Sequence, residues 1–588
     1  MPYCPDLFNP SRRKSTIVRI GSLLMGGGEP VRVQSMTNTS TMDTKASVAQ
    51  VLRLVEVGAE LVRLTAQGER EAANLANIKA ALREKGCEVP LVADIHFNPK
   101  AADEAALHVE KVRINPGNYV DPVKTFRHFE YTEVEYALEL QKIRDRFLPF
   151  LERCSEHGTA IRIGVNHGSL SDRIMSRYGD TPAGMVESCM EFLRLCVAAS
   201  FFNVVISIKA SNTLVMVYTV RLLVERMDTE NMHFPLHLGV TEAGDGEDGR
   251  IKSAVGIGTL LLDGIGDTIR VSLSEEPEYE IPVAKQLIEL VQQRCKNNQI
   301  AAIAYPFFQP FSYQRRETRS VGFMGGTQVP VVLVNEGKRR VAEALEGGQT
   351  GVSYPIITAD EFDCLVDIPT TITFVTITLN SLNESRLKQL DANENIVLLL
   401  HAKSLGERRA FFHALMNAGC RTPVILCVEE SYATAEELQL GLSLDVGPLL
   451  MDGFGDGLMY IPAAGSLVKT DWITRVLFGI LQATRLRISK TEYISCPGCG
   501  RTLFDLQRTI ARIKARTNQL KGLKIGIMGC IVNGPGEMAD ADYGYVGAGR
   551  GKVSLYKGQT CVERNIPEDQ AVDKLVELIK QYGDWKEQ

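Results

Sequence analysis

The chain has 588 residues, of which 45% are hydrophobic and 23% are charged, as in soluble globular proteins. This length is too great for one ordinary core and predicts three or four domains of about 150 residues each. The 65 basic and 71 acidic residues give a formal net charge of -6. Such a balance provides no general attraction to nucleic acid or to an anionic membrane, so any anion site must be a local concentration of cations.

The N-terminal residues lack the apolar core of a secretory signal, and no stretch reaches the roughly 18 uninterrupted apolar residues of a membrane span. The 13 cysteines are spread over a long chain and do not form the dense framework of a small secreted protein. We therefore expect free thiols, a reducing compartment and a cytoplasmic location.

From residue 31 to residue 273 the sequence repeats one plan: a short β-rich apolar run, polar residues at its C-terminal end, and a longer helical pattern. The mean spacing of about 34 residues fits one strand and one crossover helix, so eight units predict a closed (β/α)₈ TIM barrel. We also expect residues 17–20 to pair with the first strand in a hairpin that plugs the barrel floor. The eight runs are residues 31–36, 61–65, 91–96, 112–115, 160–166, 204–209, 236–242 and 269–273.

Polar residues follow these strands at the end that is reactive in such barrels. Five are cations, and only two carboxylates, Asp94 and Glu242, stand at the same ends to balance them. Like charges repel unless an anion compensates them, and guanidinium groups match phosphate oxygens. The pattern predicts a ligand with a diphosphate or several phosphates, although a salt bridge to a neighbouring strand is the alternative for any single arginine. The cations are Arg63, Arg113, Arg162, Lys209 and Arg270, accompanied by His96, Asn115, Asn166, Thr241 and Ser272.

Two glycine-rich segments do not indicate a nucleotide site. Residues 244–249 are too acidic for a phosphate loop and predict a flexible connection. Residues 256–258 lack the third glycine and the preceding strand of a dinucleotide fingerprint.

Three cysteines and a glutamate near the C-terminus have the spacing of a metal cluster. Cys496 and Cys499 form a Cys-x-x-Cys pair, Cys530 follows a strand-like run, and the turn at residues 533–537 ends in Glu537. Three soft thiolates and one hard, exchangeable carboxylate would leave one iron open to a substrate oxygen. Two alternatives remain open: a structural zinc with Cys561 or a distant histidine as fourth ligand, and a redox dithiol.

The segment between the barrel and these cysteines contains an internal repeat. Residues 258–267 match residues 447–456, and the register places Met459 where the first copy has Arg270. The match predicts a second, barrel-like α/β domain by duplication. Because the copy loses the cation, we expect a structural spacer and not a second active site. The expected domains are residues 1–280, 281–478 and 479–588, of which the last is α+β.

Taken together, these motifs resemble the 4-hydroxy-3-methylbut-2-enyl diphosphate synthases of the methylerythritol phosphate pathway, in their large three-domain form. The resemblance implies reductive ring opening and dehydration of 2-C-methyl-D-erythritol 2,4-cyclodiphosphate to (E)-4-hydroxy-3-methylbut-2-enyl diphosphate, with reduced ferredoxin or flavodoxin as electron donor. It covers residues from about 15 to 275 and from about 480 to 565, and it is carried by residues 94–97, 113–118, 496–501 and 533–537.

The resemblance also implies roles for single residues. Cys496, Cys499 and Cys530 would hold a 4Fe-4S cluster, with Glu537 on the fourth iron until a substrate oxygen displaces it. Glu242 would donate a proton near the departing oxygen. The residues expected around the diphosphate are Arg63, Arg113, Asn115, Arg162, Asn166, Lys209, Arg270 and Ser272; Asp94 and Thr241 complete the expected binding site, His96 is a further catalytic candidate, and a homodimer is expected.

Two rival functions remain. One is a pterin-binding barrel resembling dihydropteroate synthase with an appended zinc ribbon. The other is an iron–sulfur sensor or electron carrier, which would not need five converging cations.

Overall fold

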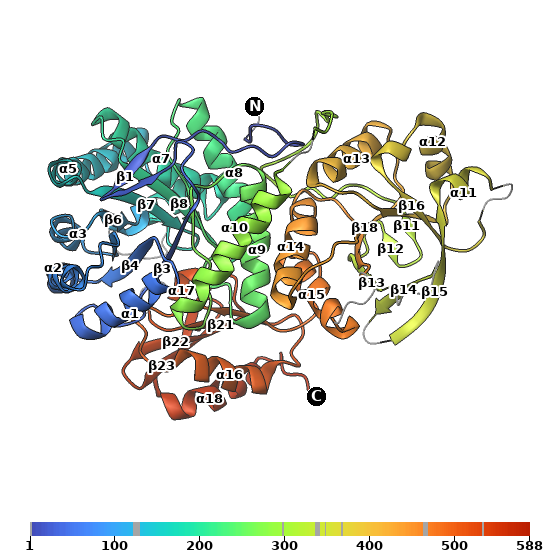
Figure 1. Cartoon of the computed structure of the whole chain (residues 1–588). Coiled ribbons are helices and arrows are strands. Elements are labelled where there is room, and N and C mark those ends of the chain that lie inside the picture. Colours follow the sequence, from blue (N-terminus) through green and yellow to red (C-terminus); the bar gives the residue numbers. More distant parts are fainter. Residues whose placement is uncertain are drawn as a thin grey trace.

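Two barrels and a smaller mixed sheet make up the molecule (Figure 1). The computed structural model describes residues 3–121, 130–296, 299–334, 341–346, 349–365, 369–462, 468–531 and 534–587. In this part of the chain, no helix is both long enough and apolar enough to cross a membrane.

Eight parallel strands form the first barrel, and helices surround it. The strands pair in the order β8-β7-β6-β5-β4-β3-β10-β9, and a bridge between Ile206 and Leu236 joins the two ends of this sheet. Parallel neighbours need a crossover connection, which a helix supplies after each strand. The predicted TIM barrel is confirmed. Its strands are β3 (Arg32–Met36), β4 (Leu61–Ala66), β5 (Leu91–Ile95), β6 (Lys111–Ile114), β7 (Ala160–Asn166), β8 (Val204–Lys209), β9 (His237–Leu238) and β10 (Thr268–Ile269).

The helices of this barrel are α1 (Thr44–Glu56), α2 (Glu69–Glu84), α3 (Pro99–Ala105), α4 (Pro116–Tyr119), α5 (Glu133–His157), α6 (Asp172–Tyr178), α7 (Pro182–Ala198), α8 (Thr213–Thr229), α9 (Gly246–Leu262), the 3₁₀ turn η1 (Pro277–Tyr279) and α10 (Glu280–Arg294). Because α9 begins at Gly246, the prediction of a flexible connection over residues 244–249 is wrong for its last four residues.

A hairpin closes the floor of the first barrel, as expected, but its second strand differs from the prediction. β1 (Val18–Ile20) pairs with β2 (Leu23–Met25) and not with β3. Gly21 adopts a φ of 60°, which glycine reaches without the strain of a side chain, and this permits the tight turn. The hairpin buries Val18, Ile20 and Met25 against the lower ends of the barrel strands.

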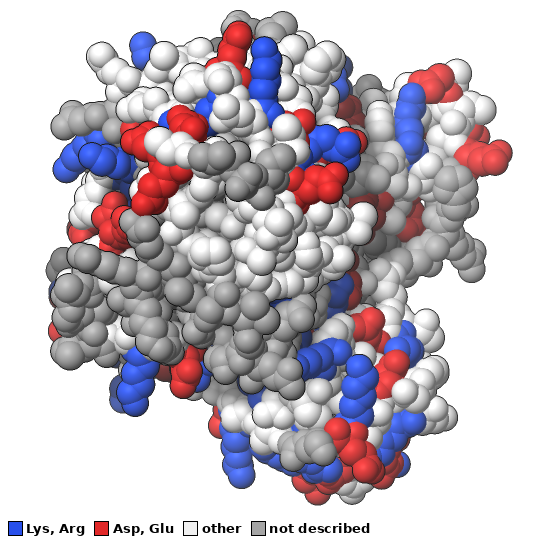
Figure 2. Space-filling view, turned by 90° about the vertical axis from the view of Figure 1, so that its right-hand side faces the viewer, with Lys and Arg blue, Asp and Glu red and all other residues white. Residues whose placement is uncertain are grey.

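The second barrel has seven strands and closes in chain order from β13 to β19. Among the described strands of this barrel, only β14 runs antiparallel to its neighbours. On the face that this barrel presents, acidic and basic side chains are intermixed (Figure 2). The strands are β13 (Val331–Val334), β14 (Val341–Glu346), β15 (Gln349–Thr358), β16 (Thr373–Ile377), β17 (Ile396–Leu400), β18 (Val424–Val428) and β19 (Gly457–Tyr460), preceded by a hairpin of β11 (Ser320–Val321) and β12 (Met324–Gly325).

The helices of the second barrel are α11 (Ala359–Asp363), the 3₁₀ turn η2 (Leu379–Ser381), α12 (Glu384–Ala392), α13 (Leu405–Asn417), α14 (Ala435–Met451) and α15 (Thr470–Ala483). The two copies of the internal repeat begin within α9 and α14, and these helices pack side by side where the barrels meet (Figure 1).

Four buried charges fix this junction. Asp263 follows α9 and Asp452 follows α14 in the repeat. Arg221 Nη2 lies 2.8 Å from Asp263 and 2.9 Å from Asp452, and Arg409 lies 2.8 Å and 2.9 Å from the same two carboxylates. All four side chains are completely buried, so the loss of one partner would leave a charge uncompensated in a dry interior.

The C-terminal sheet lies below the first barrel in the view of Figure 1. Its first three strands are parallel and its last two are antiparallel, which gives the expected mixture of helices and strands. The strands are β20 (Glu492–Ser495), β21 (Lys524–Met528), β22 (Tyr543–Gly549), β23 (Lys552–Lys557) and β24 (Thr560–Pro567), with α16 (Leu506–Thr517), α17 (Gly534–Glu537) and α18 (Glu568–Gln581).

Candidate active site

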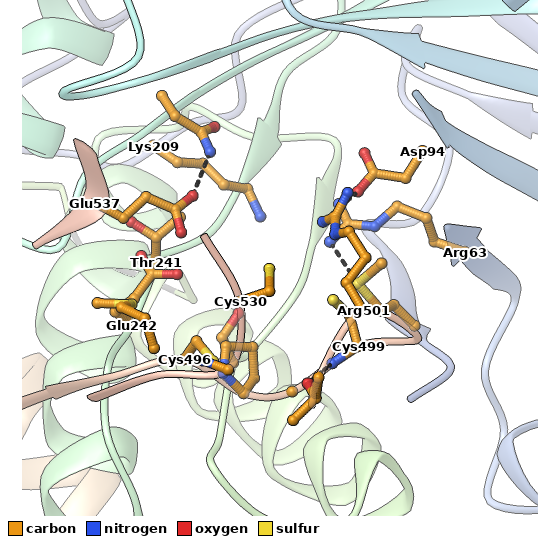
Figure 3. Close-up of a pocket in the computed structure, with 18 of the residues that line it drawn as sticks. Arg63, Asp94, Lys209, Thr241, Glu242, Cys496, Cys499, Arg501, Cys530 and Glu537 are labelled. Atoms are coloured by element: carbon orange, nitrogen blue, oxygen red, sulfur yellow. Dashed lines mark hydrogen bonds and ion pairs between the residues drawn. The ribbon is translucent and has the colours of Figure 1, made fainter. Parts of the chain in front are cut away.

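A pocket lies between the C-terminal ends of the first barrel's strands and the C-terminal ends of β20 and β21 in the C-terminal sheet (Figure 3). Most of the residues singled out in the sequence line it: Arg63, Asp94, His96, Arg113, Arg162, Asn166, Lys209, Thr241, Glu242, Arg270, Ser272, Cys496, Cys499, Cys530 and Glu537.

Asn115 does not line the pocket. Its Oδ1 accepts a hydrogen bond from Gly117 N at 3.1 Å and so caps α4, which begins at Pro116. Asn533, the first residue of the expected turn before Glu537, lies outside the described residues.

Several contacts join the barrel to the C-terminal sheet within one chain. Ala243 and Ser495 form a parallel β-bridge, and Ser274 Oγ donates to Cys496 O at 3.0 Å. Gly168 approaches the turn of Glu537 so closely that a Cβ there would lie 2.0 Å from Gly536 O. Both walls of the pocket therefore come from the same chain.

Asp94 lies at the centre of the cations. Its carboxylate is 3.2 Å from Arg113 Nη1 and 3.7 Å from Arg162 Nη2. Burial alone would raise the pKa of Asp94, but the charges of Arg63 and Arg113 outweigh it and hold this pKa well below its ordinary value. Asp94 is therefore ionised and balances only part of the positive charge around it.

Two further cations show how strongly the pocket lacks negative charge. Burial, together with neighbouring cations, lowers the pKa of Arg63 to about 10. Burial and the charges of Arg63 and Arg162 lower the pKa of Lys209 well below its ordinary value. A bound anion would relieve both effects because it compensates the like charges.

Arg270 is the exception, because it is already paired. Its Nε and Nη2 donate to the two carboxylate oxygens of Glu280 at 3.0 and 2.9 Å, and Glu280 also accepts from Ser35 Oγ at 2.6 Å. The expectation that only two carboxylates stand near the five cations is wrong. Glu280 was missed because it belongs to α10, beyond the last strand, and a survey of strand ends does not reach it.

His96 is buried as a neutral hydrogen-bond acceptor. Arg113 Nη1 contacts His96 Nε2, and an arginine can only donate. Burial and the charge of Arg113 lower the pKa of His96 well below its ordinary value. The sequence did not indicate His237, which accepts from Arg162 Nη1 at 2.9 Å in the same way.

Glu242 and Glu537 face each other across the junction of barrel and C-terminal sheet. Burial and the nearby Glu537 raise the pKa of Glu242 well above its ordinary value, which favours the protonated form of its carboxyl group. It also adopts a φ of 49°, an uncommon backbone conformation for a residue other than glycine. Glu537 accepts a hydrogen bond from Asn166 Nδ2 at 2.7 Å.

Parallel strands bring the three cysteines to one end of the sheet. Cys496 directly follows β20, and Cys530 comes two residues after the neighbouring β21. Gly529 N donates to Cys496 Sγ at 3.2 Å, and Thr502 Oγ1 accepts from Cys499 N at 3.0 Å. Among the described residues, no three His, Cys, Asp or Glu side chains gather closely enough to hold a single metal ion.

Sequence reasoning missed one charged residue of the pocket, Arg501. Its side chain is buried, and Nη2 lies 3.7 Å from Asp94 Oδ2. Burial would lower the pKa of Arg501, but the neighbouring Cys499 and Asp94 raise it. Its place two residues after Cys499 was the available signal.

Fold and site together define a TIM-barrel protein whose cationic pocket faces three cysteine thiols. The family model described as "GcpE TIM-barrel domain" matches residues 15–285, and that of the "GcpE protein C-terminal domain" matches residues 492–581. The chain therefore belongs to the GcpE family.

Two relatives match along almost the whole chain, and both are named 4-hydroxy-3-methylbut-2-en-1-yl diphosphate synthase (flavodoxin). That of Parabacteroides distasonis is 58% identical over 98% of this chain and 99% of its own length. That of Bacteroides fragilis is 57% identical over 99% of this chain and 98% of its own. The dihydropteroate synthase of Xanthomonas albilineans, a solved structure, shares 13% identity over 48% of this chain and 100% of its own, with a TM-score of 0.33, which is too low to support an argument.

Proposed function

We propose that the chain catalyses the reductive ring opening and dehydration of 2-C-methyl-D-erythritol 2,4-cyclodiphosphate to (E)-4-hydroxy-3-methylbut-2-enyl diphosphate, a step of isoprenoid biosynthesis. The observation that carries this proposal is the pocket itself, where one chain places an excess of buried cations opposite three thiols and Glu537. The names of the full-length relatives support the same reaction and name flavodoxin as the donor. Reduced ferredoxin is the alternative donor.

The donor set fits a 4Fe-4S cluster held by Cys496, Cys499, Cys530 and Glu537. A single zinc ion needs four ligand atoms around one point, whereas the thiols line one side of a pocket without converging in the described structure. Cys561, the fourth ligand in the zinc alternative, does not line this pocket. When bound, the cluster would supply electrons and one Lewis-acidic iron beside the anion pocket.

Four barrel cations would bind the diphosphate: Arg63, Arg113, Arg162 and Lys209. The Nε atoms of Arg63, Arg113 and Arg162 have no hydrogen-bond partner among the described residues, so each guanidinium retains a free donor. Asp94 and His96 orient Arg113 by accepting from it. Arg270 is bound to Glu280 on one edge, which fixes its position beside Ser272.

Glu242 would serve as the proton donor. It is buried, its pKa is raised well above the ordinary value by burial and by Glu537, and it lies beside Glu537 at the edge of the anion pocket. Loss of water requires a proton at the departing oxygen, and a carboxyl group with a raised pKa can deliver it. Closure of the C-terminal sheet over the barrel would exclude bulk water from this step.

The experiment that tests the proposal is anaerobic purification followed by metal analysis and an activity assay. We expect about four irons and four sulfides per chain, and conversion of the cyclic diphosphate with reduced flavodoxin. Colourless protein with one zinc and no turnover would refute the proposal. A homodimer and a cytoplasmic location remain predictions.

A further inference from the structure

Arg501 differs from the other cations of the pocket in its origin. In the described part of the chain, the other Lys and Arg side chains that line the pocket belong to the first barrel, whereas Arg501 comes from the C-terminal segment. Figure 3 shows it between Asp94 and Cys499. Its side chain is only 8% exposed, and its Nε has no hydrogen-bond partner among the described residues.

Asp94 connects Arg501 to the barrel's own anion-binding residues. The same carboxylate lies 3.2 Å from Arg113 and 3.7 Å from Arg162, and Arg501 approaches its other oxygen at 3.7 Å. A distance of 3.7 Å is too long for a good hydrogen bond. Arg501 is therefore held near Asp94 by charge and bonded to Cys499, and its Nε is left for another acceptor.

Other ion pairs already join the barrel to the C-terminal sheet outside the pocket. Lys252 Nζ lies 2.8 Å from Glu492, and Lys514 contacts Asp245 on the loop before α9. Since these pairs hold the two parts together, attachment alone does not explain a buried arginine inside the pocket. The position of Arg501 beside Cys499 and Asp94 explains its burial better, because a cation there lies next to the thiols and next to the barrel cations that would bind phosphate.

We propose that Arg501 is a substrate-binding residue that completes the anion pocket from the C-terminal segment, so that the cyclic diphosphate is bound by both parts of the chain at once. This inference rests on the proposed function and adds a binding residue to it. In the closed arrangement Arg501 contacts the anionic ligand and Asp94 together, and so aligns the ligand with the thiol side of the pocket.

The test is anaerobic titration calorimetry with the cyclic diphosphate on Arg501→Gln and Arg501→Lys. Both the iron-loaded and the iron-free forms are measured, so that a change in iron content cannot imitate the effect. We expect Arg501→Gln to weaken binding at least about tenfold in both forms, as the loss of a charge-assisted hydrogen bond implies. Arg501→Lys, which keeps the charge but not the forked guanidinium, should weaken binding about three- to tenfold.

The matched control is Lys514→Gln, which breaks an ion pair between the same two parts outside the pocket. Its affinity should stay within about twofold of the wild type, as for a partly exposed ion pair. Wild-type affinity in Arg501→Gln, or an equal loss in Lys514→Gln, overturns the inference. If Arg501→Gln does not fold, Arg501→Lys decides, and wild-type affinity there overturns it as well. Failure of the wild type itself to bind the ligand refutes the proposed function instead.

Discussion

The two barrels have the same backbone arrangement. Hydrogen bonds that occur in both barrels show which residue of one corresponds to which residue of the other. Ile206 N donates to Pro235 O in the first barrel, and Leu398 N donates to Pro423 O in the second, both at 2.9 Å. The aspartates of the repeat bind matching backbone N–H groups in the same way. Counting along the strands, Arg113 corresponds to Ile356, Arg162 to Phe374, Lys209 to His401 and Arg270 to Met459.

Replacement of these cations changes what fills the barrel. Phe374 and Met459 join a buried apolar cluster inside the second barrel, with Leu333 and Leu399. An apolar interior offers no compensation for a phosphate charge, and the second barrel has apolar side chains at positions where the first barrel has cations. Its expected role as a spacer stays a prediction, and this interior supports it.

The duplicated scaffold is retained where the cations are lost. Arg12 binds Asp267 at 2.7 Å, and Arg315 binds the equivalent Asp456 at 3.0 Å. Each barrel also has a short hairpin before its first strand. A few inward side chains therefore decide the chemistry of a barrel, while separate contacts at its base and at the helix junction maintain its shape.

The largest expected effect is the loss of turnover when a thiol of the pocket is replaced, compared with the replacement of a thiol in the second barrel. Cys530→Ser should abolish turnover and lower the iron content, because a serine oxygen is a poor ligand for cluster iron. Cys427→Ser, in the interior of the second barrel, should keep both. Iron analysis and absorption spectra measure this, and a Cys530→Ser protein with wild-type iron content contradicts the ligand assignment.

The next effect compares Glu242 with Glu430, its exposed counterpart in the second barrel. Glu242→Gln should lower kcat by about 10²- to 10⁴-fold because it removes a proton donor. Since burial and Glu537 raise the pKa of Glu242, the wild type should lose activity as the pH rises through that value. The Gln variant should lack this decline, and Glu430→Gln should behave as the wild type. A wild-type pH profile in Glu242→Gln would argue against the assigned role.

A smaller effect concerns the junction that both barrels share. Asp452→Asn and Asp263→Asn should each lower the free energy of unfolding by about 3–5 kcal/mol, because each leaves buried arginine charge uncompensated. Denaturant unfolding measures the loss. Asp248→Asn, which breaks the partly exposed pair with Lys490, should cost less than about 1 kcal/mol. Losses below about 1 kcal/mol in these variants would show that the four buried charges do not fix the junction between the barrels.

The smallest expected effect tests a single cation. Arg162→Leu should weaken binding of the cyclic diphosphate by roughly 10- to 150-fold, the range for one charge-assisted hydrogen bond, and leave the iron content unchanged. Phe374→Leu, at the equivalent place in the second barrel, should leave the affinity unchanged. Equilibrium binding measurements test this prediction. An unaltered affinity in Arg162→Leu would show that Arg162 does not belong to the anion site.

The strand pattern allowed the first barrel to be predicted because each parallel strand is buried and ends in polar residues. It could not show what a strand-end side chain contacts. Asn115 Oδ1 caps a helix, as an Asn before a Pro commonly does, while its Nδ2 has no partner among the described residues, so its contact with the ligand stays a prediction. The local signal for this cap had been available.

Other features depend on tertiary contacts that spacing does not encode. Glu280 reaches Arg270 from a helix beyond the last strand, and Arg501 enters the pocket only because the C-terminal sheet folds over the barrel. The short turn at Gly21 lets residues 18–20 pair with the next residues along the chain before the first barrel strand is reached. The chain therefore forms the short hairpin of β1 and β2 and not the longer hairpin that was expected.

We propose that the cations of the first barrel bring a phosphorylated ring to the thiols at the end of the C-terminal sheet. Electron paramagnetic resonance of the reduced, anaerobic protein, with and without the cyclic diphosphate, tests this most directly. We expect an iron signal that changes on addition of one equivalent of the ligand in the wild type, and that needs a higher ligand concentration to change in Arg162→Leu. An iron signal that is identical with and without the ligand, or no iron signal, would contradict it.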